Sequence, residues 1–283
     1  MYKLCVENAL GETYDLTNSK DEFYILDVQG LTAPKIEVNT KEAAGIDGSF
    51  YNSSKVGERN IVINIMLNGD IEASRQKLYR IFLIKHELTL YFTNKYRALK
   101  IKGYPESIDG DLFVQQEQIQ VSIICPRPFF ESTEQVAMEP PNIIDGFEFP
   151  FSIPSEGIEF SWIQRLTTIY TNSGDVETGA IIKFYAADNR VSNPIFYNRT
   201  TGKYFGLIFD MYENDVIIIN TREGEKSVTL LRNGSTTNIL SKRKKGSSWI
   251  VFAPGENETN YSADTGEEHL SVTVTAVQKY VGV

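Results

Sequence analysis

The sequence contains few of the residues that most catalytic and metal sites require. It has two histidines and two cysteines among 283 residues. His86 and His269 lie far apart in the chain, so we expect neither a shared metal site nor a catalytic triad. Cys5 and Cys125 have no nearby histidine or basic helix start that would activate a thiol, which favours two reduced, buried cysteines. Motifs of zinc sites, phosphate-binding loops and nucleophilic serines are also absent, so we expect no enzyme activity, metal or cofactor.

Long apolar runs and strong positive charge are missing as well. No stretch approaches the ~20 apolar residues that a membrane-spanning helix needs. The first residues lack the apolar region of a signal peptide, so we expect a protein made in the cytoplasm and no membrane partner. The net charge is −9, which argues against a sequence-specific nucleic-acid partner. The single basic run, Lys242–Lys245, is interpreted as a solvated hairpin tip, with docking to an acidic neighbour as the alternative.

The first part of the chain mixes strands with one helix. Alternating apolar residues over 61–67 predict a half-buried strand. Asp70 is placed to cap a helix that runs to about Lys85. A hairpin is predicted over 88–101, and a further strand ends at or near Cys125. This pattern is typical of an α+β domain, which we assign to residues 1–135.

Prolines and phenylalanines mark the end of this domain. Pro126 and Pro128 cannot donate to a sheet ladder, so strand pairing should stop before them. Phe129 and Phe130 follow, and we expect them to act as an interdomain anchor that seats the start of a connector. Prolines remain frequent beyond this point, which predicts a stiff linker over residues 136–156.

The remainder of the chain has the pattern of an all-β domain. Short strand candidates separated by turn residues continue through residues 157–283, and no helix of useful length is predicted. Such a pattern is typical of an antiparallel sandwich of the jelly-roll kind. The expected fold class is therefore mostly β with one helix, in two domains.

One long segment before the strand at 61–67 stands out. Residues 43–61 are rich in Gly, Ser and Asn, and a flexible loop is the simplest interpretation. Loops longer than about 12–15 residues are usually functional or disordered, however. Ile46, Phe50, Tyr51 and Val56 are apolar, which favours a strand-forming arm that orders against a neighbouring subunit.

Two other classes of function leave weaker signals. Trp162 and Trp249 could be platforms for cell-wall sugars, although each lies in an apolar strand pattern that favours core packing. Paired carboxylates such as Glu267 with Glu268 could serve a glycoside hydrolase only with suitable geometry and shifted pKa values. Solvated acids are the simpler interpretation of such pairs.

Several stretches together resemble a known family, in the same order along the chain. They are GIDGSF…GERNIVINI (45–65), CPRPFF (125–130), NPIFYNRTTGKYF (193–205), DVIIINTREGEKSVTL (215–230) and FAPGENETNYSAD (252–264). The family is that of the distal tail proteins, or baseplate hubs, of siphophages, whose tails are long and non-contractile.

The resemblance implies a structural virion protein of a phage or prophage. It implies a hexameric ring at the distal end of the tail tube, formed by the N-terminal domains, with a galectin-like C-terminal sandwich projecting outward. The implied partners are the tail tube protein, a tail-associated adhesin or lysin, and receptor-binding proteins at the periphery. The alternative is a carbohydrate-binding module or adhesin that recognises cell-wall sugars through the C-terminal sandwich.

Overall fold

The chain folds into two units. The computed structural model describes residues 2–111, 114, 116–138 and 167–283. Unit 1 comprises Met1–Glu134 and Lys279–Val283, and unit 2 comprises Gln135–Gln278. The last five residues, which the sequence analysis placed in the C-terminal domain, thus belong to unit 1, because Tyr280 and Val283 pack into its core.

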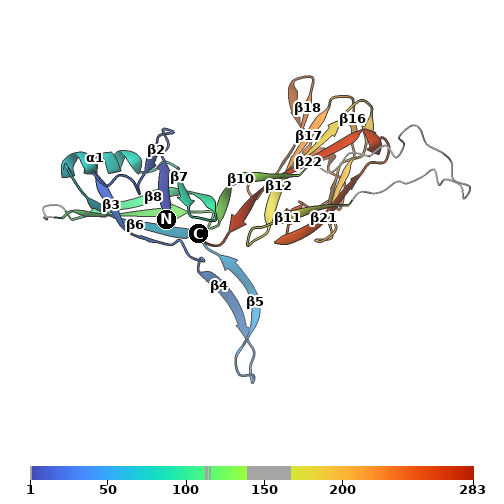
Figure 1. The fold of residues 1–283 in the computed structure, drawn as a ribbon. Helices are drawn as coiled ribbons and strands as arrows, with labels where there is room; N and C mark the ends of the chain where they lie inside the picture. The colour runs from blue at the N-terminus through green and yellow to red at the C-terminus, as the bar shows by residue number, and fades with distance from the viewer. Residues whose placement is uncertain (1, 112–113, 115, 139–166) are drawn as a thin grey trace, which may run out of the picture. The chain divides into compact units, whose positions relative to one another are not determined.

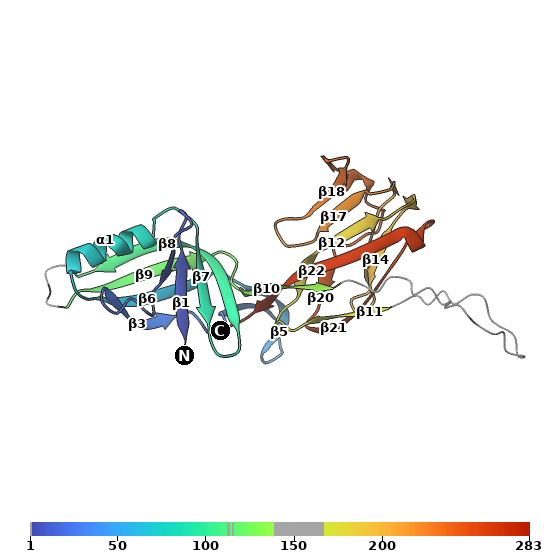
Figure 2. The same cartoon turned by 45° about the horizontal axis from the view of Figure 1, so that its top comes forward.

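Unit 1 is an antiparallel sheet covered by one helix, α1 (Ile71–Ile81). Figure 2 shows α1 along one face of the sheet. The strand order is β2-β1-β7-β8-β9-β6-β3. The core lies between the helix and this face. The strands are β1 (Lys3–Glu7), β2 (Thr13–Asp15), β3 (Phe23–Gln29), β6 (Arg59–Leu67), β7 (Leu88–Thr93), β8 (Ala98–Gly110) and β9 (Gln118–Cys125).

The helix begins where the sequence predicts and ends earlier. The Asp70 side chain accepts a hydrogen bond of 3.2 Å from the Ala73 amide, which caps the first turn. The helix ends at Ile81 rather than near Lys85. Phe82 leaves the helical conformation with its side chain fully buried, and Lys85 adopts a left-handed φ of 67°. Burial of Phe82 in the core therefore overrides the helical pattern.

The chain returns to the sheet after the two prolines. Strand β9 ends at Cys125, as predicted, but β10 (Phe130–Met138) then pairs with β8 through Glu131 and Ser132. The structure thus places a strand at the predicted beginning of the linker, residue 136. The rest of the predicted linker, from residue 139, lies outside the described residues, and so does Trp162.

Unit 2 is an antiparallel sandwich, so the predicted fold class is confirmed. One sheet has the order β19-β18-β17-β12-β22 and the other β11-β21-β14-β15 (Figure 1). Apolar side chains from both sheets form its core. The strands are β11 (Thr168–Asn172), β12 (Thr178–Ala186), β13 (Val191–Ser192), β14 (Ile195–Asn198), β15 (Lys203–Gly206), β16 (Asp210–Met211), β17 (Val216–Asn220), β18 (Ser227–Arg232), β19 (Ser235–Asn238), β20 (Val251–Phe252), β21 (Gly255–Ser262) and β22 (Leu270–Tyr280), with single 3-10 turns at Leu240–Lys242 and Glu267–His269.

A buried asparagine organises the turn into β21. The Asn257 side chain is fully buried, accepts from the Ala253 amide at 2.9 Å and donates to the Ala253 carbonyl at 2.7 Å. It also donates to the Gly255 carbonyl and accepts from the Asn198 side chain. Since buried polar groups need partners, this one buried amide fixes the turn by bonding the backbone of Ala253 and Gly255.

Replacing Asn257 should weaken unit 2. We expect Asn257→Ala to lower the free energy of unfolding by about 2–3 kcal/mol, because the Ala253 backbone groups lose their buried partners. Urea unfolding followed by circular dichroism measures this change. Asn233→Gly is the matched control, since Asn233 has a positive φ of 50° in an exposed turn, where glycine is well tolerated. Equal unfolding midpoints for both variants would contradict the proposed role of Asn257.

Candidate assembly interface

An exposed β-hairpin of unit 1, which we call the arm, is the candidate interface. It consists of β4 (Ile36–Glu42) and β5 (Ser49–Val56), which pair only with each other among the described strands. Figure 1 shows the arm extending away from the sheet of unit 1. An isolated two-stranded hairpin is marginally stable in water, and its unpaired edges are ready to pair with another chain. The arm is therefore suited to docking.

The strand register gives the arm an apolar face. Ile36 pairs with Val56, and Val38 pairs with Ser54. Paired residues of antiparallel strands lie on the same face, as do residues two apart within a strand. Ile36, Val38 and Val56 therefore share one face. Ile36 and Val38 are each more than half exposed. Exposed apolar side chains contribute no hydrophobic stabilisation to the single chain.

A β-bulge adds Tyr51 to this face. The register shifts between Asn39 and Thr40, so Tyr51 stands opposite Thr40 and Asn52 is the extra residue. One extra residue reverses the alternation of side chains beyond it. Tyr51 and Ser54 consequently lie on the same face, and their hydroxyl oxygens are 2.9 Å apart. Tyr51 is 66% exposed, the highest value among the large apolar residues of the arm.

The opposite face of the arm is polar. Lys55 forms an ion pair of 3.1 Å with Glu37, and the Asn39 side chain donates to the Ser53 hydroxyl at 3.2 Å. Phe50 is the exception on this face. The arm is thus an amphipathic ribbon, with one face that resembles a core surface and one that resembles a solvated surface.

The sequence-predicted contact residues are distributed over the arm. Tyr51 and Val56 lie on the apolar face, Phe50 lies on the polar face, and Ile46 lies in the turn at the tip. The predicted segment began at residue 43, so sequence reasoning missed the whole of β4. Its signal was weak, because the apolar alternation is limited to Ile36 and Val38 and the rest of β4 is polar or charged.

The root of the arm consists of residues 30–32, which precede β4, and Arg59, which follows β5. The buried side chain of Arg59 holds it together. Arg59, the first residue of β6, is only 3% exposed. Its guanidinium donates to the carbonyl oxygens of Gly30 and Thr32, which precede the arm, the latter at 2.7 Å. It also donates to the carbonyls of Pro128 at 2.6 Å and Val281 at 2.8 Å. Three segments distant in sequence are therefore joined by one side chain.

Aromatic packing and burial complete this cluster. The Arg59 guanidinium lies 4.6 Å from the centre of the Phe130 ring, which itself packs edge-on against Phe92 at 5.6 Å. Burial lowers the pKa of Arg59, and no carboxylate pairs with it in the described part of the chain. Phe130 is thus an anchor within unit 1, whereas Phe129 is half-buried. An interdomain role for the two phenylalanines stays a prediction.

The basic run is not a free hairpin tip. Backbone groups of Lys242–Lys245 lie against β15 and its continuation: the Ile208 amide donates to the Lys242 carbonyl at 2.8 Å, and the Lys244 amide donates to the Gly206 carbonyl at 2.9 Å. The run therefore covers a sheet edge that would otherwise be open. Lysine-rich cover is a known way to prevent edge-to-edge aggregation.

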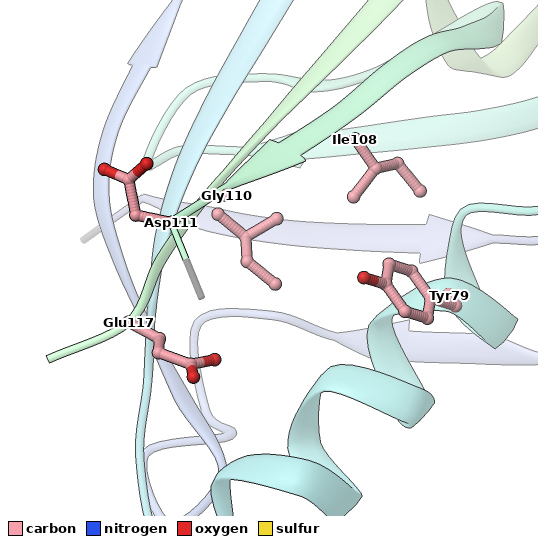
Figure 3. Close-up of a pocket in the computed structure, with 6 residues that line it drawn as sticks. Tyr79, Ile108, Gly110, Asp111 and Glu117 are labelled. Carbon is pink, nitrogen blue, oxygen red and sulfur yellow. The ribbon is translucent and has the colours of Figure 1, made fainter. Parts of the chain in front are cut away.

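A small cavity beside α1 does not provide a ligand site. Figure 3 shows the Tyr79 side chain on the helix and, across the cavity, Asp111 and Glu117 beside the ends of β8 and β9. The cavity has a volume of about 80 Å³. Ligand pockets usually measure about 300–1,000 Å³, so this space suits a few water molecules. Glu117 is instead the ion-pair partner of Arg75 on the helix.

The two histidines do not meet. His269 lies 2.6 Å from Asp188 and 3.3 Å from Glu268, and His86 is in another unit. Within the described ranges, no group of three or more His, Cys, Asp or Glu residues is arranged to hold a metal ion. Burial raises the pKa of Cys125 to about 12, which keeps the thiol protonated and inert. No helix of the described residues is long and apolar enough to span a membrane.

Solved structures of similar fold come from phage tails. The crystal structure of the SPP1 Dit (gp 19.1) protein, described as a paradigm of the hub adsorption apparatus in phages infecting Gram-positive bacteria, matches with a TM-score of 0.71 and 15% identity, over 99% of each chain. Chains of the phage P2 baseplate in its activated conformation, with Ca or Sr, match with TM-scores of 0.57 and 11% identity, over 100% of each chain. These likenesses concern the fold.

Family models match the sequence in both units. The phage tail protein RIFT-related domain matches residues 10–125, and the siphovirus-type tail component, C-terminal domain, matches residues 173–277. None of the curated proteins is similar enough in sequence to match. The two matches cover most of the chain in the order expected from the resemblance, which is thereby confirmed. The chain belongs to the siphophage distal tail family and is a structural component of the virion tail.

Proposed function

We propose that six copies of this chain close into a ring at the distal end of the tail tube. Unit 1 forms the ring, and unit 2 is an accessory module for attachment of other tail-tip proteins. In this position the ring joins the tail tube protein to a tail-associated adhesin or lysin, and its periphery accepts receptor-binding proteins. The function is assembly rather than catalysis.

The amphipathic arm is the observation that carries this proposal. A closed ring needs head-to-tail contacts, in which one surface of a subunit meets a different surface of the next. The apolar face of the arm supplies one such surface, and its unpaired strand edges supply main-chain groups for pairing. Burial of this face in a neighbouring subunit would remove exposed apolar area from water, which favours the closed ring.

The ring contact can be tested on the apolar face. We expect the double variant Val38→Ser, Tyr51→Ser to weaken subunit association at least tenfold per contact, because burying each large apolar side chain contributes about 1.5–3 kcal/mol. Native mass spectrometry and sedimentation across a concentration series measure the hexamer directly. A wild-type chain that stays monomeric at all concentrations, alone and with its tail tube partner, would contradict the proposed function.

A matched control uses the opposite face. Lys55→Ser changes a residue of β5, the strand that carries Tyr51, and should leave assembly unchanged. The ion pair of Lys55 with Glu37 is exposed and contributes little. If Lys55→Ser disrupted the ring as strongly as the double variant, the apolar face would not be the contact. Circular dichroism of each variant confirms that unit 1 remains folded.

The alternative, sugar binding through unit 2, makes a separate prediction about Trp249. Its ring lies 5.0 Å from that of the fully buried Phe205 and packs against the core of unit 2. We expect Trp249→Ala to destabilise unit 2 by about 3 kcal/mol, the low end for loss of a large aromatic side chain. Thermal unfolding measures this effect. A variant with unchanged stability that lost binding to cell-wall polysaccharide would instead support the carbohydrate-binding alternative.

A further inference from the structure

Residues of unit 1 that lie near its two connections to unit 2 contact the root of the arm. The chain passes between the units twice, in β10 and in β22. Pro128, just before β10, and Val281, just after β22, both present their carbonyl oxygens to Arg59. The same guanidinium binds Gly30 and Thr32 before the arm, and Arg59 itself follows the arm. One side chain thus contacts a residue beside each connecting strand as well as the segment before the arm, and it belongs to the strand that follows the arm.

The residues after β22 also contact the arm root directly. The Val283 amide donates to the Leu31 carbonyl at 3.1 Å. A Cβ on Gly282 would lie 3.1 Å from the same carbonyl oxygen and 3.5 Å from the Thr32 carbonyl carbon. Backbone therefore packs on backbone here, and a side chain at position 282 would crowd the Leu31 carbonyl oxygen and push the two segments apart by a few tenths of an ångström or more. The segment 281–283 thus lies directly against the backbone of residues 31–32.

The arginine contacts depend on one another. A buried guanidinium must satisfy its N–H groups, and here backbone carbonyls rather than a carboxylate do so. If the segment 281–283 moves away, one donor of the fork loses its partner and the remaining bonds become exposed to water. Lysine cannot substitute, because a single ammonium group has no planar fork that reaches separate segments.

We propose that Arg59 is a positioning residue that sets the direction of the arm only while the segment 281–283 is docked. The arm is thereby coupled to the two connections between the units, and a displacement of either connection changes how the arm is presented. As far as it concerns subunit contacts, this inference rests on the proposed ring function. The coupling itself is a property of the single chain.

Hydrogen–deuterium exchange of the arm tests the coupling without assembly. Two variants are compared with wild type at a concentration where all are monomeric. One is Arg59→Lys, and the other is Gly282→Val, which leaves Arg59 intact and is expected to displace residues 281–283 because its side chain crowds the Leu31 and Thr32 backbone. We expect exchange in peptides covering residues 30–42 and 49–58 to rise at least about tenfold in both variants. Peptides from β9 should exchange as in wild type, since the sheet core stays folded.

Arg97→Gln is the matched control. Arg97 lies 4.4 Å over the ring of Tyr280 at the end of β22, so the variant removes an arginine–aromatic contact from the same segment without touching the arm root. Wild-type exchange of the arm in Gly282→Val would overturn the coupling even if Arg59→Lys failed to fold. Monomeric wild-type chains that never form rings would overturn the proposed function, whereas the exchange result would stand. Rings with unaltered arm exchange in Gly282→Val would overturn only the coupling.

Discussion

A buried guanidinium that is satisfied by carbonyl oxygens is the constraint on which unit 1 depends. Removing Arg59 from water costs solvation free energy that a neutral apolar residue would not cost. The benefit of the buried arginine is geometric, because its planar fork of N–H groups fixes the positions of several segments at once. Two of those segments, at Gly30 and Val281, are separated by most of the chain. The arginine therefore contributes a defined arrangement more than it contributes net stability.

Orientation matters here because the arm has two unlike faces. A hairpin with the same side chains on both faces could dock at many angles, whereas in the proposed contact this one buries most apolar area when the face of Val38 and Tyr51 meets the neighbouring subunit. The bulge at Asn52 decides which face that is, since it turns Tyr51 to the side of Val38. Specific docking thus needs a fixed root and a fixed register, and neither feature alone would define the contact.

The features that were predictable from sequence are those encoded by neighbouring residues. Alternation over 61–67 gave β6, Asp70 gave the helix start, and regular turn signals gave the sandwich. The role of Arg59 could not be predicted in this way, because its partners lie up to 222 positions away. The helix end was also missed, since burial of Phe82 is a tertiary effect that local periodicity does not record.

The same distinction explains why the candidate interface was only partly predicted. Four apolar residues after position 43 stood out against a polar background. Which of them share a face of the hairpin, however, depends on how its two strands pair. It requires the register of β4 on β5, and a shift by one residue exchanges the two sides. For a protein whose proposed role lies in its surfaces, composition can therefore indicate that a segment has a partner. Only the paired strands indicate which side chains meet it.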